Sequence, residues 1–290
     1  MTLSESQLIS WSHQGSITLS SNTYNSINYA LESSKDKIKA SFEVYLQGSY
    51  KNSTNIYGNS DVDVVVEMTS TFYSNLTEEE KLRLNLEPAS IDWKKFRESV
   101  LSVLQSYYGI DNVDISGSKS IKIKKASNRL NADVVVSSCY KYYEDLHVRA
   151  HGITFFSLPD YNQITNYPKL HYENGISKNS STQNLYKPII RIFKNIKEQI
   201  ITENPQYQEK FPSFLIENLL YNVPNSKYTG NYQSTTYNIL DWLSNNLSVN
   251  KSGDFICQSG MFYLFGPLST QWNIQDALLF KELAIGKWNN

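Results

Sequence analysis

The sequence predicts an α+β fold, with a mixed sheet flanked by helices over residues 1–160 and a helical lobe over residues 161–290. Two observations predict this division. Short β-branched runs of nearly alternating polarity are confined to the first part, whereas helical spacings of apolar side chains dominate after residue 182. Between these parts, proline, tyrosine and asparagine crowd residues 158–184, which predicts a long loop.

The first part begins with a rather polar helix, predicted over residues 17–40. A short apolar run predicts a strand over 42–46, which ends at Gly48-Ser49. A polar loop follows up to residue 60, and the Val-rich run 61–67 predicts a second strand. The capping-box spacing of Thr77 and Glu80 predicts a short helix over 77–86.

An apolar stripe predicts a longer helix that starts at Ser90 as its N-cap and ends before Gly109. Two further strands, over 120–125 and 130–137, are predicted to pair as a hairpin. In the second part the helical patterns cover residues 182–203, 212–222, 234–247 and 273–288.

Composition excludes several classes of protein. With 290 residues, 40% of them hydrophobic and 19% charged, the chain is globular rather than disordered. Its apolar runs are too short to span a membrane, and its first residues resemble no secretory signal, so we expect a cytoplasmic protein. Cys139 and Cys257 are too far apart for zinc-ligand spacing. A net charge of −1 gives no field for non-specific binding of nucleic acid.

The informative motif consists of Gly48-Ser49, eleven further residues and then Asp61-Val62-Asp63. Side chains alternate along a strand, so Asp61 and Asp63 share one face, about 7 Å apart. Asp133 opens another Val-rich run. If the two strands are neighbours, three carboxylates converge on one patch.

Three ionised carboxylates at close range repel one another, and divalent cations relieve that repulsion. Mg²⁺ prefers such hard oxygen ligands, and two ions about 3.5–4 Å apart clamp both oxygens of a phosphoryl displacement. Glycine lets the backbone approach a triphosphate, and the serine hydroxyl donates to its oxygens. An isolated Asp-x-Asp is usually solvated and an isolated Gly-Ser is usually a turn; their combination with Asp133 favours a catalytic site.

The Gly-Ser-x₁₁-Asp-x-Asp arrangement resembles the polymerase-β-like nucleotidyltransferase superfamily. Within it, the whole chain resembles the bacterial cGAS/DncV-like nucleotidyltransferases (CD-NTases), which make cyclic oligonucleotide signals in anti-phage (CBASS) defence. The segments that carry this second resemblance are 166–175 with Lys178, 186–194 and 212–217. The resemblance implies a nucleotidyltransferase core, a C-terminal helical lobe and an active site in the cleft between them.

The resemblance also implies the roles of single residues. Asp61 and Asp63 would bind two magnesium ions, with Mn²⁺ as an alternative, and Asp133 would bind the catalytic ion and orient the attacking hydroxyl. Gly48 and Ser49 would hold the triphosphate of the donor nucleotide.

The second part of the chain would supply further nucleotide contacts. Lys194 and Ser213 would reach the phosphates and Phe214 would stack on a base, although a solvated lysine, a helix N-cap and a core aromatic are the plain alternatives. Lys178 would also contact the nucleotide, whereas His171 is expected to be structural. Asn166 and Asn174 would read the nucleobases, and their amides favour a uridine-containing product.

The predicted reaction condenses nucleoside triphosphates (ATP, UTP or others) into a cyclic oligonucleotide, most simply a cyclic dinucleotide, with release of pyrophosphate. The alternatives are a nucleotidyltransferase that modifies RNA, protein or a small molecule, and an inactive nucleotide-binding module. We expect a monomer that needs neither membrane nor nucleic acid, with regulatory or effector proteins encoded separately. The product bases, the linkage, the ring size and the activating signal stay open at this stage.

Overall fold

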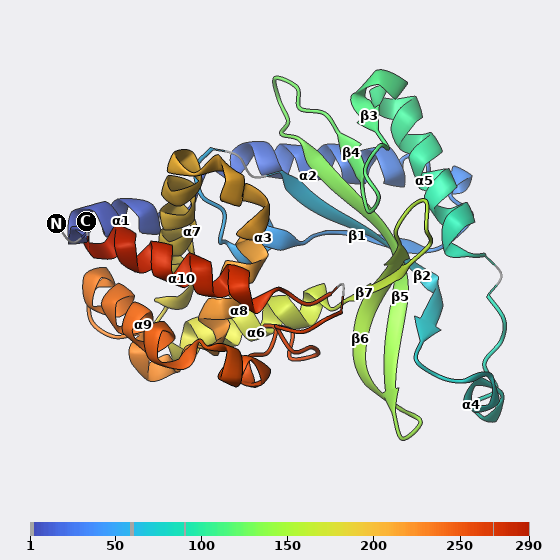
Figure 1. The fold of residues 1–290 in the computed structure, drawn as a ribbon. Helices are drawn as coiled ribbons and strands as arrows, with labels where there is room; N and C mark the ends of the chain where they lie inside the picture. Colours follow the sequence, from blue (N-terminus) through green and yellow to red (C-terminus); the bar gives the residue numbers. More distant parts are fainter. Residues whose placement is uncertain (1–2, 59–60, 90, 269, 290) are drawn as a thin grey trace. The chain divides into compact units, whose positions relative to one another are not determined.

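The computed structural model describes residues 3–58, 61–89, 91–268 and 270–289, and it has the predicted α+β fold (Figure 1). It divides into two compact units. The sheet unit consists of Ser16–Lys51 and Ser60–Pro168, and the helical unit of Met1–Gly15, Asn52–Asn59 and Lys169–Asn290. The sequence prediction drew one boundary at residues 160 and 161; the structure differs by including an N-terminal segment and part of the motif loop in the helical unit.

The sheet unit contains one mixed sheet, of seven strands in the described residues, in the order β1-β2-β5-β4-β3, with β6 pairing both β5 and β7. β2 and β5 are parallel, and every other pair is antiparallel. The strands are β1 (Phe42–Leu46), β2 (Val62–Ser74), β3 (Val113–Asp114), β4 (Ile121–Ile123), β5 (Ala132–Glu144), β6 (His147–Phe156) and β7 (Gln163–Asn166).

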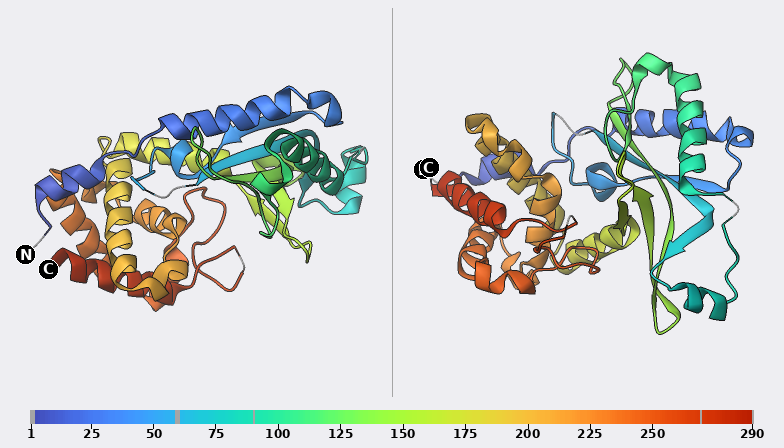
Figure 2. Two further views of the ribbon diagram at one scale, coloured as in Figure 1. Left: turned by 90° about the horizontal axis from the view of Figure 1, so that it is seen from above. Right: turned by 45° about the vertical axis from the view of Figure 1, so that its right-hand side comes forward.

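Two helices, α2 (Thr18–Glu32) and α5 (Trp93–Tyr108), cover one face of this sheet (Figures 1 and 2). Alternate residues of β2 and β5, such as Val64 and Val134, point into the apolar core beneath them. The residues between, Asp63 and Asp133 among them, therefore point to the opposite face. This alternation places the acidic residues on the side of the sheet that the two helices leave uncovered.

The helical unit packs around α7 (Tyr186–Glu203), a helix whose apolar residues are buried along most of its length. Its core is contributed mainly by leucine, isoleucine and aromatic side chains of α1 (Glu5–Ser12), α8 (Ser213–Asn222), α9 (Tyr232–Asn246) and α10 (Ile274–Asn289). Nowhere in the described residues is there a helix both long enough and apolar enough to cross a membrane.

The shorter elements are the helices α3 (Gly48–Asn52), α4 (Glu78–Arg83) and α6 (Pro168–Ser181) and the 3₁₀ turns Lys35–Lys37, Ile110–Asn112, Pro205–Lys210, Asn225–Lys227 and Val249–Asp254. The capping box of Thr77 and Glu80 is confirmed at the start of α4. The predicted 120–125/130–137 hairpin is confirmed as the antiparallel pair β4–β5. All four helices predicted after residue 182 are also confirmed, as α7 to α10.

Other predictions were wrong. The first long helix ends at Glu32 rather than residue 40. The predicted N-cap Ser90 lies outside the described residues, and Asp92 caps α5. The expected loop 158–184 contains β7 and α6. The helix was missed because the residues that it buries, His171, Gly175 and Lys178, form no apolar stripe.

Candidate active site

The sheet places two of the predicted carboxylates side by side. Asp63 in β2 and Asp133 in β5 are direct partners in a parallel ladder, where paired residues point to the same face. The flanking valines pair in the same register, so burial of the valines fixes the position of the acids. Oδ1 of Asp133 accepts a hydrogen bond from the hydroxyl of Ser120, at 2.9 Å. The predicted meeting of Asp63 and Asp133 is confirmed.

Asp61 precedes β2 and is exposed. Burial of Tyr50 raises the pKa of that residue, and the negative charge of Asp61 raises it further. Asp61 therefore lies near Tyr50, the residue that follows Gly48-Ser49. Within the described parts of the chain, no three His, Cys, Asp or Glu side chains are grouped so that they could hold a metal ion. The structure therefore brings Asp63 and Asp133 together, and Asp61, which lies outside the β2–β5 ladder, stays a predicted third ligand.

Gly48 lies directly against the acidic pair. Its φ is +64°, a left-handed conformation that glycine adopts readily. A Cβ at this position would lie 2.1 Å from Oδ2 of Asp63, far inside contact distance. The close approach of backbone and carboxylate therefore requires glycine, and it brings the Gly48-Ser49 turn beside Asp63.

The residues of this face fit a magnesium site. Asp63 and Asp133 offer oxygen ligands from one face, and Ser120 orients one of those carboxylates. The carboxylate of Asp63 fills the space that a Cβ would need at Gly48, so the backbone of the Gly48-Ser49 turn lies within reach of the same ligand. Hard oxygen donors in this arrangement suit Mg²⁺ or Mn²⁺.

Asn166 ends β7 and is exposed on the sheet unit. It pairs with Ile153 of β6, whose other neighbour is Cys139 of β5, so a short ladder joins Asn166 to the strand that carries Asp133. In the helical unit, the amide nitrogen of Asn174 donates to the carbonyl of Gln258 at 2.8 Å. The Asn174 amide is thus engaged in holding that loop.

The structure does not support the predicted role of Lys178 in binding nucleotide. Its ammonium donates to the carbonyl of Val223 and the side chain of Asn225, inside the helical unit. The rings of Tyr186, Tyr221 and Tyr228 surround it, with centroids 5.2 to 5.6 Å away. Burial lowers the pKa of Lys178 to about 8.

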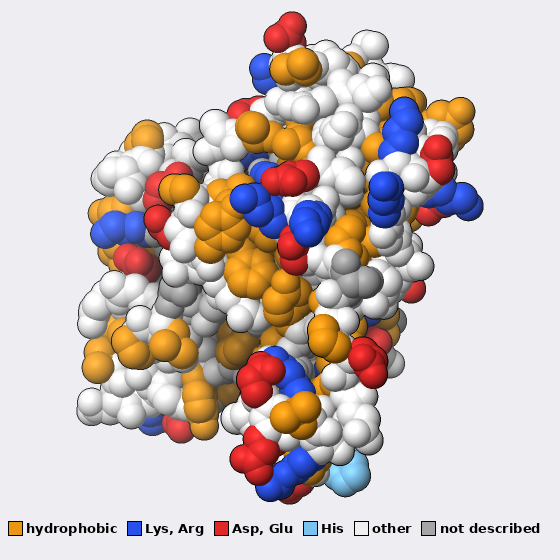
Figure 3. Space-filling view, turned by 90° about the vertical axis from the view of Figure 1, so that its right-hand side faces the viewer, with side chains coloured by type: hydrophobic (Ala, Val, Ile, Leu, Met, Phe, Trp, Pro, Cys, Tyr) orange, Lys and Arg blue, Asp and Glu red, His pale blue; other side chains and the backbone are white. Residues whose placement is uncertain are grey.

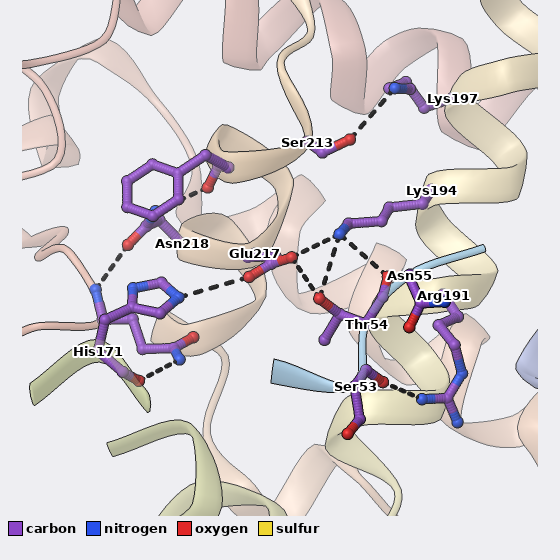
Figure 4. A network of polar contacts seen from close by, with 12 residues as sticks. Ser53, Thr54, Asn55, His171, Arg191, Lys194, Lys197, Ser213, Glu217 and Asn218 are labelled. Atoms are coloured by element: carbon purple, nitrogen blue, oxygen red, sulfur yellow. Dashed lines mark hydrogen bonds and ion pairs between the residues drawn. The ribbon is translucent and has the colours of Figure 1, made fainter. Parts of the chain in front are cut away.

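Lys194 is also buried rather than directed at a phosphate. Only 3% of it is exposed, and its ammonium is 2.5 Å from Oε1 of Glu217 and 3.1 Å from the carbonyl of Thr54 (Figure 4). Burial raises the pKa of Glu217, but the charges and hydrogen bonds of Lys194 and His171 outweigh it and hold that pKa well below its usual value. The ammonium of Lys194 is therefore already committed to an internal ion pair.

The start of α8 presents the other predicted contacts. The ammonium of Lys197, one turn beyond Lys194 on α7, lies 3.3 Å from the hydroxyl of Ser213. Phe214 is 46% exposed and its ring stacks on that of His171, with centroids 5.0 Å apart. A core role for Phe214 is therefore wrong, whereas its exposed ring suits stacking on a base.

The sequence predictions missed Ser120, which contacts Asp133, and three residues of the helical unit: Thr54, Lys197 and Glu217. They also missed the contacts of His171 with Glu217 and Phe214. A single signal could have found one of them. Glu217 is a charged residue inside the run Phe-Leu-Ile-Glu-Asn-Leu-Leu, and a carboxylate in an apolar helix needs a buried partner.

Comparisons with known proteins identify the family of this chain. The family model of the cGAS/DncV-like nucleotidyltransferase C-terminal helical domain matches residues 173–289. The chain is 42% identical to a cyclic UMP-AMP synthase of Rhodothermus marinus, over 99% of this chain and 98% of that protein. It is 38% identical to the cyclic nucleotide synthase CdnE01 of Staphylococcus haemolyticus, over 96% of this chain and 95% of that one.

Solved structures of cyclic dinucleotide synthases are also similar to this chain. The Rhodothermus marinus CdnE c-UMP-AMP synthase, solved with Apcpp and Upnpp, superimposes with a TM-score of 0.90 at 41% identity, over 99% of this chain and 97% of that one. The Elizabethkingia meningoseptica CdnE cyclic dinucleotide synthase, solved with GTP and Apcpp, gives 0.81 at 29% identity, over 98% of both chains. Because these similarities run along nearly the whole of each protein, this chain belongs to the cGAS/DncV-like nucleotidyltransferases.

Proposed function

We propose that this protein condenses two nucleoside triphosphates into a cyclic dinucleotide that contains uridine, with UTP and ATP as substrates. The observation that carries the proposal is the in-register pair Asp63–Asp133 with Gly48 packed against it. The similarity to a cyclic UMP-AMP synthase supports this choice of bases. Relatives at 32% and 30% identity are named for dipurine and dipyrimidine products, so the bases differ among members of this family.

Each of the two steps forms one phosphodiester bond. A ribose hydroxyl of one nucleotide attacks the α-phosphorus of another, the bond to the β-phosphate oxygen breaks, and pyrophosphate leaves. The carboxylate of Asp133, fixed by Ser120, accepts a hydrogen bond from the attacking hydroxyl and orients it. Gly48 and Ser49 bind the triphosphate of the donor nucleotide through backbone and hydroxyl groups. In the second step the triphosphate of the linear intermediate is attacked, which closes the ring.

Magnesium would be held by Asp61, Asp63 and Asp133. When bound, two Mg²⁺ ions, or Mn²⁺ in their place, neutralise the charge of the phosphate oxygens. The chain itself places the carboxylates of Asp63 and Asp133 on the face of the sheet opposite α2 and α5. Mutual repulsion of those groups is the feature that a divalent cation relieves.

Base recognition falls to Asn166 and Phe214. The Asn166 amide offers one donor and one acceptor, which complements the edge of uracil and also that of adenine. The exposed ring of Phe214 offers a stacking surface for either base. That Asn166 and Phe214 lie beside the same cleft is a prediction.

Nucleotides rather than nucleic acid are the partners that the surface favours. Basic and acidic side chains are interspersed on the face shown in Figure 3, and the net charge is −1. A protein that holds a nucleic acid strand usually presents a continuous basic stripe. We infer that the product serves as a signal in anti-phage defence in the cytoplasm, read by separately encoded proteins.

Incubation of the protein with all four nucleoside triphosphates and Mg²⁺, without RNA, tests the proposal. After phosphatase treatment, mass spectrometry should find a cyclic product that contains one uridine and one adenosine. Asp63→Asn and Asp133→Asn variants, checked for folding, should yield none. Linear, phosphatase-sensitive products alone would reject the cyclisation, and product formation only with added RNA would favour an RNA-modifying enzyme.

A further inference from the structure

A buried ion pair in the helical unit joins the segment around Thr54 to His171. Lys194 and Glu217 are 3% and 4% exposed, with their charged groups 2.5 Å apart (Figure 4). Burying such a pair costs desolvation energy that its attraction only roughly offsets, and an apolar pair of similar volume is often as stable. Stability alone is therefore a weak reason for charges at this place.

One oxygen of the Glu217 carboxylate holds the chain beside Thr54. The hydroxyl of Thr54 donates to Oε1 of Glu217 at 2.7 Å, and the ammonium of Lys194 donates to both the carbonyl and the hydroxyl of Thr54. Arg191 also donates to the neighbouring carbonyl of Ser53. Thr54 is 1% exposed and lies in Asn52–Asn59, the part of the motif loop that belongs to the helical unit.

This anchored segment lies within the eleven residues that separate Ser49 from Asp61. Ser49 is five residues before Thr54, and Asp61 is seven residues after it. Anchoring Thr54 restricts the conformations of the chain on both sides of it. The anchor therefore influences where the triphosphate-binding serine and the first acidic residue are held.

The other oxygen of Glu217 holds the ring beneath Phe214. Nε2 of His171 lies 3.4 Å from Oε2 of Glu217, and the carbonyl of His171 accepts a hydrogen bond from Gln258. His171 is 6% exposed and stacks on Phe214 at an interplanar angle of 23°. The orientation of Phe214, the proposed base platform, is thus supported by a ring that Glu217 fixes.

We propose that Glu217 is a positioning residue that fixes both arms of the nucleotide site, the triphosphate arm through Thr54 and the base arm through His171 and Phe214. This inference rests on the proposed function, because it takes Ser49 and Phe214 as nucleotide contacts. Glu217 itself is 4% exposed and touches no substrate.

Two binding probes separate the arms: magnesium tripolyphosphate, which has no base, and a magnesium complex of a non-hydrolysable UTP analogue. Calorimetric binding to the full chain gives a Kd for each. Thr54→Val keeps the side-chain volume and removes the hydroxyl, so both probes should bind about tenfold more weakly. Thr54→Ser, which restores the hydroxyl, should return both Kd values to within about twofold of the unaltered protein.

His171→Leu should weaken the UTP analogue by about tenfold and leave tripolyphosphate unchanged. Glu217→Gln leaves the Lys194 charge buried without an ionic partner and can destabilise the fold for that reason alone. The decisive variant is therefore the double variant Lys194→Met with Glu217→Leu, which removes both charges. This double variant should melt within a few degrees of the unaltered protein and still bind both probes about tenfold more weakly. Ile239→Val, a core change in α9, is the control for general loosening and should alter neither Kd.

Unchanged binding of both probes by a folded double variant would overturn the proposal. Weakening of one probe alone would also overturn it, because Glu217 would then fix a single arm. If the double variant fails to fold, the single variants decide: unchanged binding of both probes by Thr54→Val, or unchanged binding of the UTP analogue by His171→Leu, would overturn the proposal. Failure of the unaltered protein to bind the analogue or to release pyrophosphate would instead reject the proposed function.

Discussion

Replacing Gly48 by alanine tests the contact between the backbone turn and the acidic pair. The added Cβ would lie 2.1 Å from Oδ2 of Asp63, whereas ordinary contact begins at 3.4 Å, so the carboxylate has to move by about 1.3 Å. The left-handed φ of +64° costs an alanine about 1–2 kcal/mol. A displacement of about 1 Å in a catalytic group lowers the rate by about 100-fold.

The Gly48→Ala variant should therefore lose about 1–2 kcal/mol of unfolding free energy but about 100-fold in kcat for pyrophosphate release. The Asp63 carboxylate can rotate away, so the steric conflict acts on activity more than on stability. Gly109→Ala is a control for backbone strain without a steric conflict: its φ is +84° and its ψ 144°, and the nearest atom to a new Cβ is 3.8 Å away. Only glycine adopts that conformation readily, so this variant should lose at least as much stability as Gly48→Ala and keep full activity.

Chemical denaturation and a pyrophosphate-release assay on both variants measure the two quantities. If Gly48→Ala kept kcat within about twofold of the unaltered enzyme, the close approach to Asp63 would not matter for catalysis and the reasoning would be refuted. Equal activity losses in both variants would show that backbone strain alone is responsible.

Two further predictions follow from single contacts. Ser120→Ala removes the hydrogen bond that orients Asp133, so the unfolding free energy should fall by about 1 kcal/mol and kcat should fall as well; an unaltered kcat would remove Ser120 from the site. Burial lowers the pKa of Lys178 from 10.5 to about 8, so the folded state binds fewer protons than the unfolded state between these values, and stability should rise with pH across that window. Lys178→Met should lack this rise in denaturation curves between pH 7.5 and 9.5, whereas parallel pH profiles of the two proteins would contradict the assignment.

The sequence was informative where burial follows a simple period. Residues alternate along both strands, so Val64 and Val134 point to the helix-covered face and the two acids to the other face; this predicted that the acids meet if the strands are neighbours. The same alternation put Asp61 on the face of Asp63, but Asp61 lies just outside the strand.

The sequence was misleading where polar residues are buried. Lys194 lies beside the apolar face of α7, and it is buried there by Thr54 and Glu217, which come from other segments of the chain. Lys178 enters a ring of tyrosines that come from distant parts of the chain. For both lysines, exposure depends on partners that local periodicity does not identify.

Strands β6 and β7 escaped prediction for a related reason. β6 mixes histidine, arginine and glycine with its apolar residues, and β7 has only four residues. β6 pairs with the later residues of the long strand β5, whose first residues pair with β4, and β7 pairs with β6. Long-range pairing of this kind leaves little trace in a short segment of sequence.

The central claim is that Asp63 and Asp133 jointly seat a metal ion beside a bound triphosphate. Titration of Mn²⁺ into the protein with a non-hydrolysable nucleotide, followed by electron paramagnetic resonance, tests it without relying on turnover. The unaltered protein should bind Mn²⁺ only weakly without nucleotide and tightly with it, and either Asp63→Asn or Asp133→Asn, each correctly folded, should abolish the tight binding. Tight Mn²⁺ binding retained in both variants would contradict the claim.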